Sequence, residues 1–204
     1  MNLIILAGMP ATGKSTVAAS LSKAFGYPIL EKDNIKEGLF DTLGFENYPR
    51  KRALDHAANE VLLRVLEAML KAGTSLIVDN NFDTASAEKL CALLETYNPN
   101  CATIFLKGDP QVLYQRYAER DNLHKRHLGQ VLQDHYPPRE GDSLYYTMTP
   151  EEFDEKFFKR GMAQFRCPGE RIDVDMSDFS KVSLDDLCAP VKELLARAGK
   201  LDEV

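Results

Sequence analysis

The chain has 204 residues, of which 44% are hydrophobic and 27% charged; this composition is ordinary for a soluble globular protein, and the length suffices for one α/β domain with a sizeable core. No apolar run approaches the roughly 18 residues of a membrane-spanning helix, and the short N-terminal run lacks the basic flank of a signal peptide, so we expect a cytoplasmic protein without a membrane partner. The formal net charge of −6 disfavours binding to long nucleic acid, although a local basic groove would still accept a short end.

Apolar runs alternate with helical patterns along the chain, which is typical of a parallel sheet built from βαβ units. Strands are expected near 2–7, 28–31, 75–79, 101–106 and 170–175. Helices are expected near 14–25, 34–43, 51–72, 85–96, 110–121 and 184–198. No linker, repeat or low-complexity tract divides the chain. We therefore predict a single α/β domain over 1–204, with a five-stranded parallel sheet flanked by helices.

Local signals fix several helix boundaries. Asp109 precedes a proline that suits a first helical turn, and Thr149 opens the capping-box pattern Thr-Pro-Glu-Glu. The helix over 51–72 carries a broad apolar stripe that we expect to pack on the sheet, formed by Leu54, Ala58, Val61, Leu62, Val65, Leu66, Met69 and Leu70.

Residues 121–149 mix charges, prolines, glycines and aromatics without clear periodicity. This segment is too long for a plain connection inside a compact domain, and such loops often serve as lids. We predict a lid or substrate insertion over about 121–165.

The four cysteines are widely spaced and include no C-x-x-C pair, which argues against a zinc site. A disulfide framework is not expected in a chain of this size. We interpret them as reduced structural residues: Cys91, Cys101, Cys167 and Cys188.

The clearest motif is the P-loop pattern, in which Gly8 is followed after four residues by Gly13, Lys14 and Ser15. It stands between a predicted strand and a predicted helix, where backbone N–H groups and the helix N-terminus favour a phosphate. Lys14 would reach the β- and γ-phosphates and Ser15 would ligate Mg²⁺. The predicted nucleoside triphosphate site comprises Gly8, Met9, Pro10, Ala11, Thr12, Gly13, Lys14, Ser15 and Thr16.

Two carboxylates follow predicted strands on the edge of the sheet that would carry the phosphates. Asp33 follows the second strand and would accept the proton of an attacking hydroxyl or orient it; alternatively it caps the helix that follows. Asp79 ends the third strand and would hold Mg²⁺. Asn80, Asn81 and Asp83 either contact substrate or form a polar turn, with Asp83 as a helix cap.

Arg116 and Arg120 are four residues apart on a predicted helix and so share a face. We expect them to neutralise charge on the transferring phosphoryl group; the alternative is a solvated face paired with Glu119 and Asp121. The roles of Lys125 and Arg126 stay open. The remaining lid candidates have structural alternatives: His124, His127 and His135 have no metal-ligand spacing and are interpreted as loop residues, while Tyr136, Tyr145 and Tyr146 stack on an aromatic substrate or pack the insertion.

With these motifs placed, the chain resembles a family of small P-loop kinases with an AAA-type ATP-binding domain. It looks related to the kinase domain of polynucleotide kinase, to chloramphenicol phosphotransferase, to gluconate kinase and to zeta toxins. The resemblance covers roughly 2–130 and, more loosely, the final strand and helix. It is carried by "GMPATGKST", "EKDNIKEGLF", "LIVDNNF" and "LYQRYAER". It implies ATP with Mg²⁺, a role for Asp33 at the acceptor hydroxyl, and a lid arginine pair at Arg116 and Arg120. "KRHLGQ" looks like a degenerate form of the family's R-H-P-G-H stretch.

Three functions fit these residues. The first, which we favour, is a kinase that transfers the γ-phosphoryl group of ATP to a hydroxyl of a small-molecule acceptor. The second is a polynucleotide 5′-hydroxyl or nucleotide kinase, against which Lys36 stands where polynucleotide kinases usually carry arginine, since a lysine cannot bind phosphate in bidentate fashion. The third is an ATP-binding switch or weak ATPase with a protein partner. Neither the acceptor nor the oligomeric state is readable from the sequence.

Overall fold

The computed structural model describes residues 1–122, 126–144 and 148–198. Its centre is a five-stranded sheet in the order β2-β3-β1-β4-β5, with every neighbouring pair parallel. The strands are β1 (Asn2–Gly8), β2 (Ile29–Glu31), β3 (Leu76–Asp79), β4 (Asn100–Lys107) and β5 (Glu170–Asp175). All five lie within two residues of the ranges expected from the apolar runs, so the predicted parallel sheet is confirmed.

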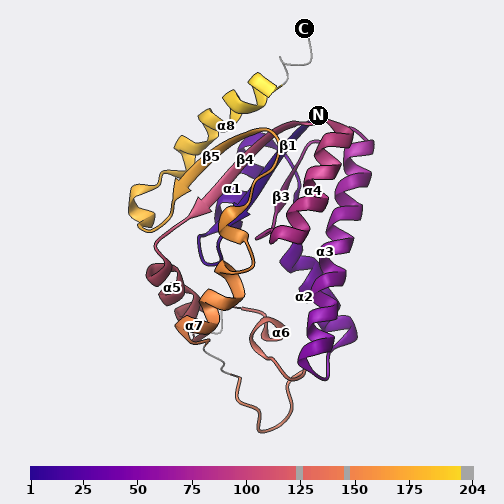
Figure 1. The fold of residues 1–204 in the computed structure, drawn as a ribbon, viewed down its shortest axis with the longest axis vertical. Coiled ribbons are helices and arrows are strands. Elements are labelled where there is room, and N and C mark those ends of the chain that lie inside the picture. Colours follow the sequence, from indigo (N-terminus) through magenta and orange to yellow (C-terminus); the bar gives the residue numbers. More distant parts are fainter. Residues whose placement is uncertain (123–125, 145–147, 199–204) are drawn as a thin grey trace.

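Helices cover both faces of the sheet (Figure 1). Their bounds are α1 (Lys14–Phe25), α2 (Lys32–Leu43), α3 (Tyr48–Lys71), α4 (Thr84–Tyr97), α5 (Pro110–Asn122), α6 (Leu128–Val131), α7 (Pro150–Phe153) and α8 (Leu184–Ala198). Three short turns of other helical type complete the elements: a π-helix at Asp154–Phe158 and 3₁₀ turns at Met162–Gln164 and Phe179–Lys181. None of the helices in the described ranges combines the length and apolar character needed to cross a bilayer.

Alternation along the strands builds two cores. In β1, Leu3 and Ile5 face α3 and α4, whereas Ile4 and Leu6 face α1 and α8, and all four side chains are fully buried. A strand buried on both faces reads as a continuous apolar run, because each successive side chain points to the opposite layer. This is why the sheet was visible in the sequence.

The apolar stripe of α3 is narrower than predicted. Leu54, Leu62 and Leu66 are buried against α2 and the sheet, but Val61 and Val65 are exposed to solvent. Including these two valines on the core face was wrong, since their positions rotate off the buried stripe of a helix with 3.6 residues per turn. The helix also begins earlier than expected, at Tyr48, because Asn47 caps it by accepting a hydrogen bond from the backbone N–H of Arg50.

The expectation that all four cysteines are reduced is also wrong. Cys91 on α4 forms a disulfide with Cys167, which precedes β5, across 76 residues of sequence. Cys101 and Cys188 are free thiols. The pairing has no local signature, because only the tertiary packing of α4 beside the 161–167 region brings the two Cα atoms to 5.4 Å.

The described parts of the 121–165 region lie beyond the carboxyl ends of the strands, at the opposite end of the molecule from the N-terminus (Figure 1). Two small apolar clusters attach it to the rest of the chain. Phe153 and Phe157 pack against Tyr117 of α5, and Leu132 packs against Phe40 of α2. The predicted capping box is confirmed: the Thr149 hydroxyl accepts from the backbone N–H of Glu152, whose carboxylate accepts from the N–H of Thr149.

Candidate active site

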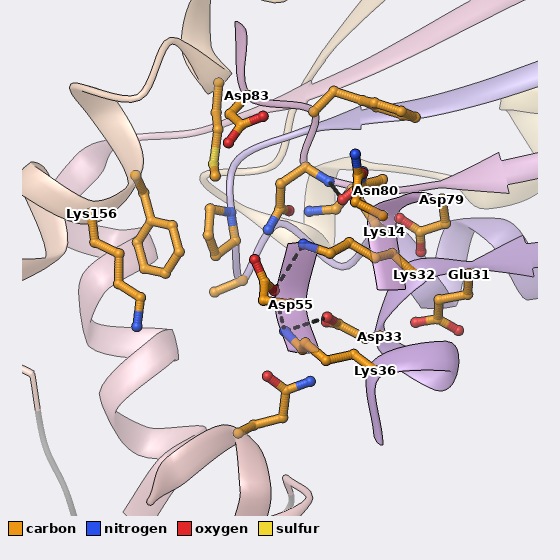
Figure 2. A pocket seen from close by; sticks show the side chains of 18 of the residues that line it. Lys14, Glu31, Lys32, Asp33, Lys36, Asp55, Asp79, Asn80, Asp83 and Lys156 are labelled. Carbon is orange, nitrogen blue, oxygen red and sulfur yellow. Dashed lines mark hydrogen bonds and ion pairs between the residues drawn. The ribbon is translucent and has the colours of Figure 1, made fainter. Parts of the chain in front are cut away.

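A cavity of about 570 Å³ opens at the carboxyl ends of β2 and β3. Its walls come from the loop after β1, from α2, α3 and α5, and from the 121–165 region. Figure 2 shows Lys14, Glu31, Asp33 and Asp79 gathered on one side of the cavity and Lys156 on the other. Ligands of open α/β sheets bind at this edge, because the connecting loops diverge there.

The loop from Gly8 to Thr16 forms the floor of the cavity. Gly8 has φ 127°, and a Cβ atom there would lie 2.0 Å from the carbonyl oxygen of Leu106, so no other residue fits. The Lys14 amine lies across the loop and donates to the carbonyls of Met9 at 2.8 Å and Gly8 at 3.3 Å. Burial lowers the pKa of Lys14, and the carboxylate of Asp79 only partly offsets this. An amine held over backbone carbonyls in a cavity is arranged to receive an anion.

Two carboxylates flank the Ser15 hydroxyl. Glu31 and Asp79 are partners in the register of β2 and β3, and the Ser15 hydroxyl lies 2.9 Å from Glu31 Oε1 and 3.3 Å from Asp79 Oδ2. Burial raises the pKa of Asp79 to about 7, and it also raises the pKa of Glu31. Oxygen atoms of this kind are the ligands that Mg²⁺ prefers. Within the described ranges, no group of three or more His, Cys, Asp or Glu side chains gathers as a metal site, so a cation here also needs oxygens from elsewhere.

The sequence analysis did not single out Glu31. The available signal was its position at the end of the second strand. This strand pairs with β3, which in turn pairs with the P-loop strand β1. Glu31 is also the N-cap residue of α2, which begins at Lys32. The alternative that Asp33 caps this helix is therefore wrong, because Asp33 already lies inside the first turn, where its charge complements the helix dipole.

Asp33 belongs to a network of four charged side chains from α2 and α3. Its carboxylate pairs with Lys36 at 3.0 Å, and Asp55 pairs with Lys32 at 2.9 Å and with Lys36 at 3.3 Å (Figure 2). Burial alone would raise the pKa of Asp33, but the Lys36 ammonium holds it well below its usual range. The Asp33 side chain is nevertheless half exposed to the cavity. It is therefore an ionised carboxylate that a ligand can reach.

Both predicted arginines line the cavity, but they do different things. The Arg116 guanidinium donates to the carbonyl oxygens of Met176 and Ser177 and stacks on Phe179, with 3.7 Å between its central carbon and the ring centroid. The Phe179 ring in turn lies against Gly13. This contact places Arg116 beside the P-loop and the turn after β5.

Arg120 lines the cavity about one helical turn further along α5. Its guanidinium is 5.5 Å from the Tyr117 ring, and its buried Nε has no hydrogen-bond partner among the described residues. Burial lowers its pKa, and Arg120 interacts electrostatically with both Lys14 and Asp33. Of the alternative partners, Asp121 pairs with Arg126 instead, at 2.9 Å.

The polar residues after β3 are largely engaged with one another. The Asn80 amide donates to Asn59 at 3.1 Å and accepts from the N–H of Asn81. Asp83 caps α4 by accepting from the N–H of Ser86, as the structural alternative predicted, and it pairs with Arg160.

The described lid histidines have structural contacts, in agreement with the loop interpretation. His127 accepts from the N–H of Gly129 and lies 2.9 Å from Asp41, and His135 lies 2.6 Å from Asp142. Tyr136 packs against Phe40 and Phe45, in agreement with the packing alternative. The interpretations of His124, Lys125, Tyr145 and Tyr146 fall outside the described residues.

The cations that line the cavity and that the sequence did not indicate include Lys51, Lys156 and Arg160. Lys51 is buried on α3 and donates to the carbonyls of Gln130 and Leu132. Burial lowers the pKa of Lys51 to about 7 and that of Lys156 to about 8. No local sequence pattern indicates these three residues. Lys51 looks like a surface residue of a helix, and Lys156 and Arg160 follow a segment without periodicity.

Comparisons with known proteins agree with this geometry. The sequence pattern of a family described as an AAA domain matches residues 3–138. A curated relative, the L-seryl-tRNA(Sec) kinase of Methanococcus maripaludis, is 33% identical over 122 residues, which is 58% of this chain. The match spans 46% of the relative's own length, so the chain corresponds to about half of that protein.

Solved structures of low sequence identity share the fold. A proposed kinase from Chloroflexus aurantiacus superposes with a TM-score of 0.74 at 22% identity, covering 97% of both chains. A gluconokinase from Sinorhizobium meliloti gives 0.54 at 18% identity, covering 98% of this chain and 95% of the other. The APS kinase of Mycobacterium tuberculosis, solved with AMPPNP and APS, gives 0.54 at 18%, covering 96% and 97%. The fold expected from the P-loop motif is thereby confirmed.

Proposed function

The chain belongs to the AAA-domain family of P-loop proteins, and from this premise we propose that it is an ATP-dependent kinase acting on a hydroxyl of a small-molecule acceptor. The observation that carries the proposal is the ionised Asp33 carboxylate, which shares one cavity with Lys14 of the P-loop and remains half exposed there. A nucleotide-binding switch has no need of a reachable carboxylate opposite the phosphate loop. A kinase needs one to hold its acceptor.

Backbone N–H groups of the P-loop would hold the triphosphate. The proposed site comprises Gly8, Met9, Pro10, Ala11, Thr12, Gly13, Lys14, Ser15 and Thr16; Pro10 shapes the loop but has no N–H to donate. The Lys14 amine would exchange its carbonyl partners for phosphate oxygens. Ser15, Asp79 and Glu31 fit a Mg²⁺ ion, because a hydroxyl between two carboxylates is a set of hard oxygen donors. Bound Mg²⁺ would neutralise charge on the β- and γ-phosphates.

Asp33 would act on the acceptor as an orienting group more than as a strong base. A carboxylate whose pKa lies well below its usual range takes up a proton reluctantly. Phosphoryl transfer passes through a loose transition state in which positioning matters most. In the reaction, the acceptor oxygen bonds to the γ-phosphorus, the bond to the β–γ bridging oxygen breaks, ADP leaves, and the hydroxyl proton passes by way of Asp33 to solvent.

The two arginines would divide the remaining work. Arg120 has a buried guanidinium with an unpartnered Nε close to Lys14 and Asp33, which suits stabilisation of charge on the transferring group. Arg116, stacked on Phe179 beside Gly13, suits contact with the nucleotide. The 121–165 region would close over the site as a lid of a single domain and exclude water.

ATP consumption by the purified protein with Mg²⁺ tests the proposal. Assays would compare the protein alone with the protein plus pooled sugars, sugar phosphates, nucleosides, nucleotides and 5′-hydroxyl oligonucleotides. Stimulation by one pool, lost in Lys14→Ala and strongly reduced in Asp33→Asn, is the expected result. Tight ATP binding without stimulation by any pool would favour a nucleotide-dependent switch instead.

The comparison with L-seryl-tRNA(Sec) kinase favours a second candidate, a hydroxyl on an aminoacyl group carried by RNA. The match covers 58% of this chain but leaves about half of that relative uncovered. Transfer of labelled phosphate to seryl-tRNA, with uncharged tRNA as control, decides between this acceptor and a small molecule.

A further inference from the structure

The acceptor side of the cavity is cationic, although the chain as a whole carries a net charge of −6. Eleven lysines and arginines line the cavity, against seven aspartates and glutamates. Lys14, Arg116 and Arg120 belong to the nucleotide side. The remaining cations come from α2, α3, α4 and the 121–165 region, so several independent elements direct positive charge into the same space.

Most of the cations nearest Asp33 are already neutralised by a carboxylate. Lys36 pairs with Asp33 and Lys32 with Asp55, while Arg126 pairs with Asp121 and Arg160 with Asp83. Two lysines on the acceptor side are left over: among the described residues, neither Lys51 nor Lys156 has a carboxylate partner. Arg52 of α3 also lacks one, and its guanidinium contacts His56.

These two lysines differ in what their amines touch. The Lys51 amine donates to the carbonyls of Gln130 and Leu132, which engage two of the three N–H donors of its ammonium form. The Lys156 amine has no hydrogen-bond partner in the described part of the chain; its recorded contact is the face of the Phe157 ring, 5.7 Å from the centroid. Figure 2 shows the Lys156 side chain extending into the cavity, across from Asp55 and Lys36. Of these two lysines, Lys156 is therefore the one whose amine is free to bind a ligand.

The cluster carries more positive charge than its surroundings stabilise. Burial, together with the charges of Lys36, Arg126 and Arg160, lowers the pKa of Lys156 to about 8, against a single opposing contribution from Asp55. Lys51 experiences the same repulsion from Lys156 and Lys36. Like charges in a partly desolvated site are favourable only when an anion joins them. This cluster of cations therefore favours a ligand with negative charge.

We propose that the acceptor is a small hydroxyl compound that already bears a phosphate group. Lys156 binds this phosphate, the positive charges of Lys51 and Arg126 add to the attraction, and the acceptor hydroxyl faces Asp33. This inference rests on the proposed kinase function and adds the substrate class. A bound phosphomonoester favours the protonated form of both lysines, and the two ammonium groups then meet its double charge. A single carboxylate would leave one of them uncompensated. The cavity of about 570 Å³ must also admit a triphosphate, so the acceptor is small.

A binding experiment tests the phosphate site apart from catalysis. The protein is first saturated with a non-hydrolysable ATP analogue and Mg²⁺, so that the P-loop is occupied, and inorganic phosphate is then titrated by calorimetry. Wild type should bind phosphate, and Lys156→Met, which keeps the apolar stem, should bind it at least about tenfold more weakly. Lys159→Met, an exposed lysine three residues on, is the matched control and should equal wild type.

Equal affinity for the ATP analogue in all three proteins establishes that Lys156→Met is folded and its P-loop intact. Absence of phosphate binding to the loaded wild type would overturn the inference. Binding that is unchanged in Lys156→Met would overturn it equally.

Transfer assays with matched acceptors then test the substrate class. Each pair differs by one phosphate: glycerol and glycerol 3-phosphate, ribose and ribose 5-phosphate, glucose and glucose 6-phosphate, with gluconate as a carboxylate arm. We expect transfer only to phosphorylated members, and in Lys156→Met a KM raised at least about tenfold with kcat within threefold.

Transfer to the neutral member, to gluconate or to RNA as readily as to the sugar phosphates would overturn the inference and leave the kinase function standing. If no acceptor is phosphorylated while ATP binds, the kinase proposal fails, and the calorimetric comparison alone decides the phosphate site.

Discussion

Glu31 and Asp79 stand opposite each other in the register of β2 and β3, and the hydroxyl of Ser15 lies between their carboxylates. The arrangement follows from the parallel sheet: two neighbouring strands end at the same level, so their last side chains share one edge with the P-loop. The carboxylates are brought together by the backbone register and not by a sequence motif, since 48 residues separate them in the chain.

If this trio holds Mg²⁺, removing either charge should weaken metal-dependent nucleotide binding. We expect Glu31→Gln and Asp79→Asn to lower the affinity for ATP·Mg²⁺ by at least about tenfold, the smallest usual cost of disturbing a metal site. Titration of a fluorescent ATP analogue at several Mg²⁺ concentrations measures it. Glu46→Gln, at an exposed position, is the control. Unchanged Mg²⁺ dependence in Glu31→Gln would remove Glu31 from the metal site.

The role of Asp33 can be separated from its ion pair with Lys36 by comparing the two partners. Asp33→Asn should lower kcat by about a hundredfold, the order expected for loss of a group that positions the acceptor hydroxyl, and leave ATP affinity unchanged. Lys36→Met removes the same ion pair but keeps the carboxylate, so its kcat should fall much less. Steady-state kinetics with the identified acceptor provides the comparison. Equal losses of kcat in the two variants would reduce Asp33 to a structural partner.

Arg116 and Arg120, which the sequence placed in one lid pair, should separate kinetically. Arg116→Ala and Phe179→Ala each break the stack beside Gly13, and we expect a several-fold higher KM for ATP with little change in kcat, in line with the modest energy of a partly exposed cation–π contact. Arg120→Ala should instead lower kcat. Initial rates over a range of ATP concentrations distinguish these effects. A kcat loss in Arg116→Ala as large as that in Arg120→Ala would return Arg116 to the transferring phosphoryl group.

Features with a local cause were predictable from the sequence. The strands appear as apolar runs because both of their faces are buried, and the P-loop is readable because glycine spacing, lysine and hydroxyl are contiguous. The caps at Asp83, Asp109 and Thr149 are local for the same reason, each side chain bonding to backbone within three residues.

Features that depend on tertiary contact were not predictable. Glu31 comes close to Asp79 only when β2 is aligned with β3. Lys156 reaches the cavity only when the 148–162 region packs on α5. Val61 and Val65 misled, because an apolar side chain signals helix periodicity without showing where the buried stripe ends. The Cys91–Cys167 pair has no sequence signature at a separation of 76 residues.

That disulfide should be measurable as a contribution to stability. Closing so long a loop restricts the unfolded chain, and its loss typically costs about 2–4 kcal/mol. Cys91→Ser should therefore unfold at lower temperature than wild type, and reduction of the wild type should give a similar shift, while Cys188→Ser should not. Thermal unfolding with and without reductant tests this. A count of four reactive thiols in the denatured, unreduced protein, in place of two, would contradict the pairing.

Lys51 gives the fold a dependence on pH that a single variant can isolate. Burial lowers its pKa from 10.5 to about 7, so the charged form is disfavoured in the folded state. Below pH 7 both states carry the proton and the full cost of burying the charge is present. Between pH 7 and 10.5 the unfolded state holds a proton that the folded state has released, so this residue makes stability rise with pH, by at most about 1.4 kcal/mol per pH unit.

Lys51→Met should remove that rise. Urea unfolding at intervals from pH 7 to 10 gives the free energy of unfolding, and the expected result is a shallower increase in the variant than in the wild type. Lys192→Met, an exposed lysine on α8, should keep the wild-type slope because its charge is solvated in both states. Since the Lys51 amine also links α3 to the carbonyls of Gln130 and Leu132, the variant should in addition expose the 128–132 turn to faster amide exchange. Identical pH slopes in Lys51→Met and wild type would mean that the lysine keeps its charge in the folded protein throughout this range, held by those two carbonyls.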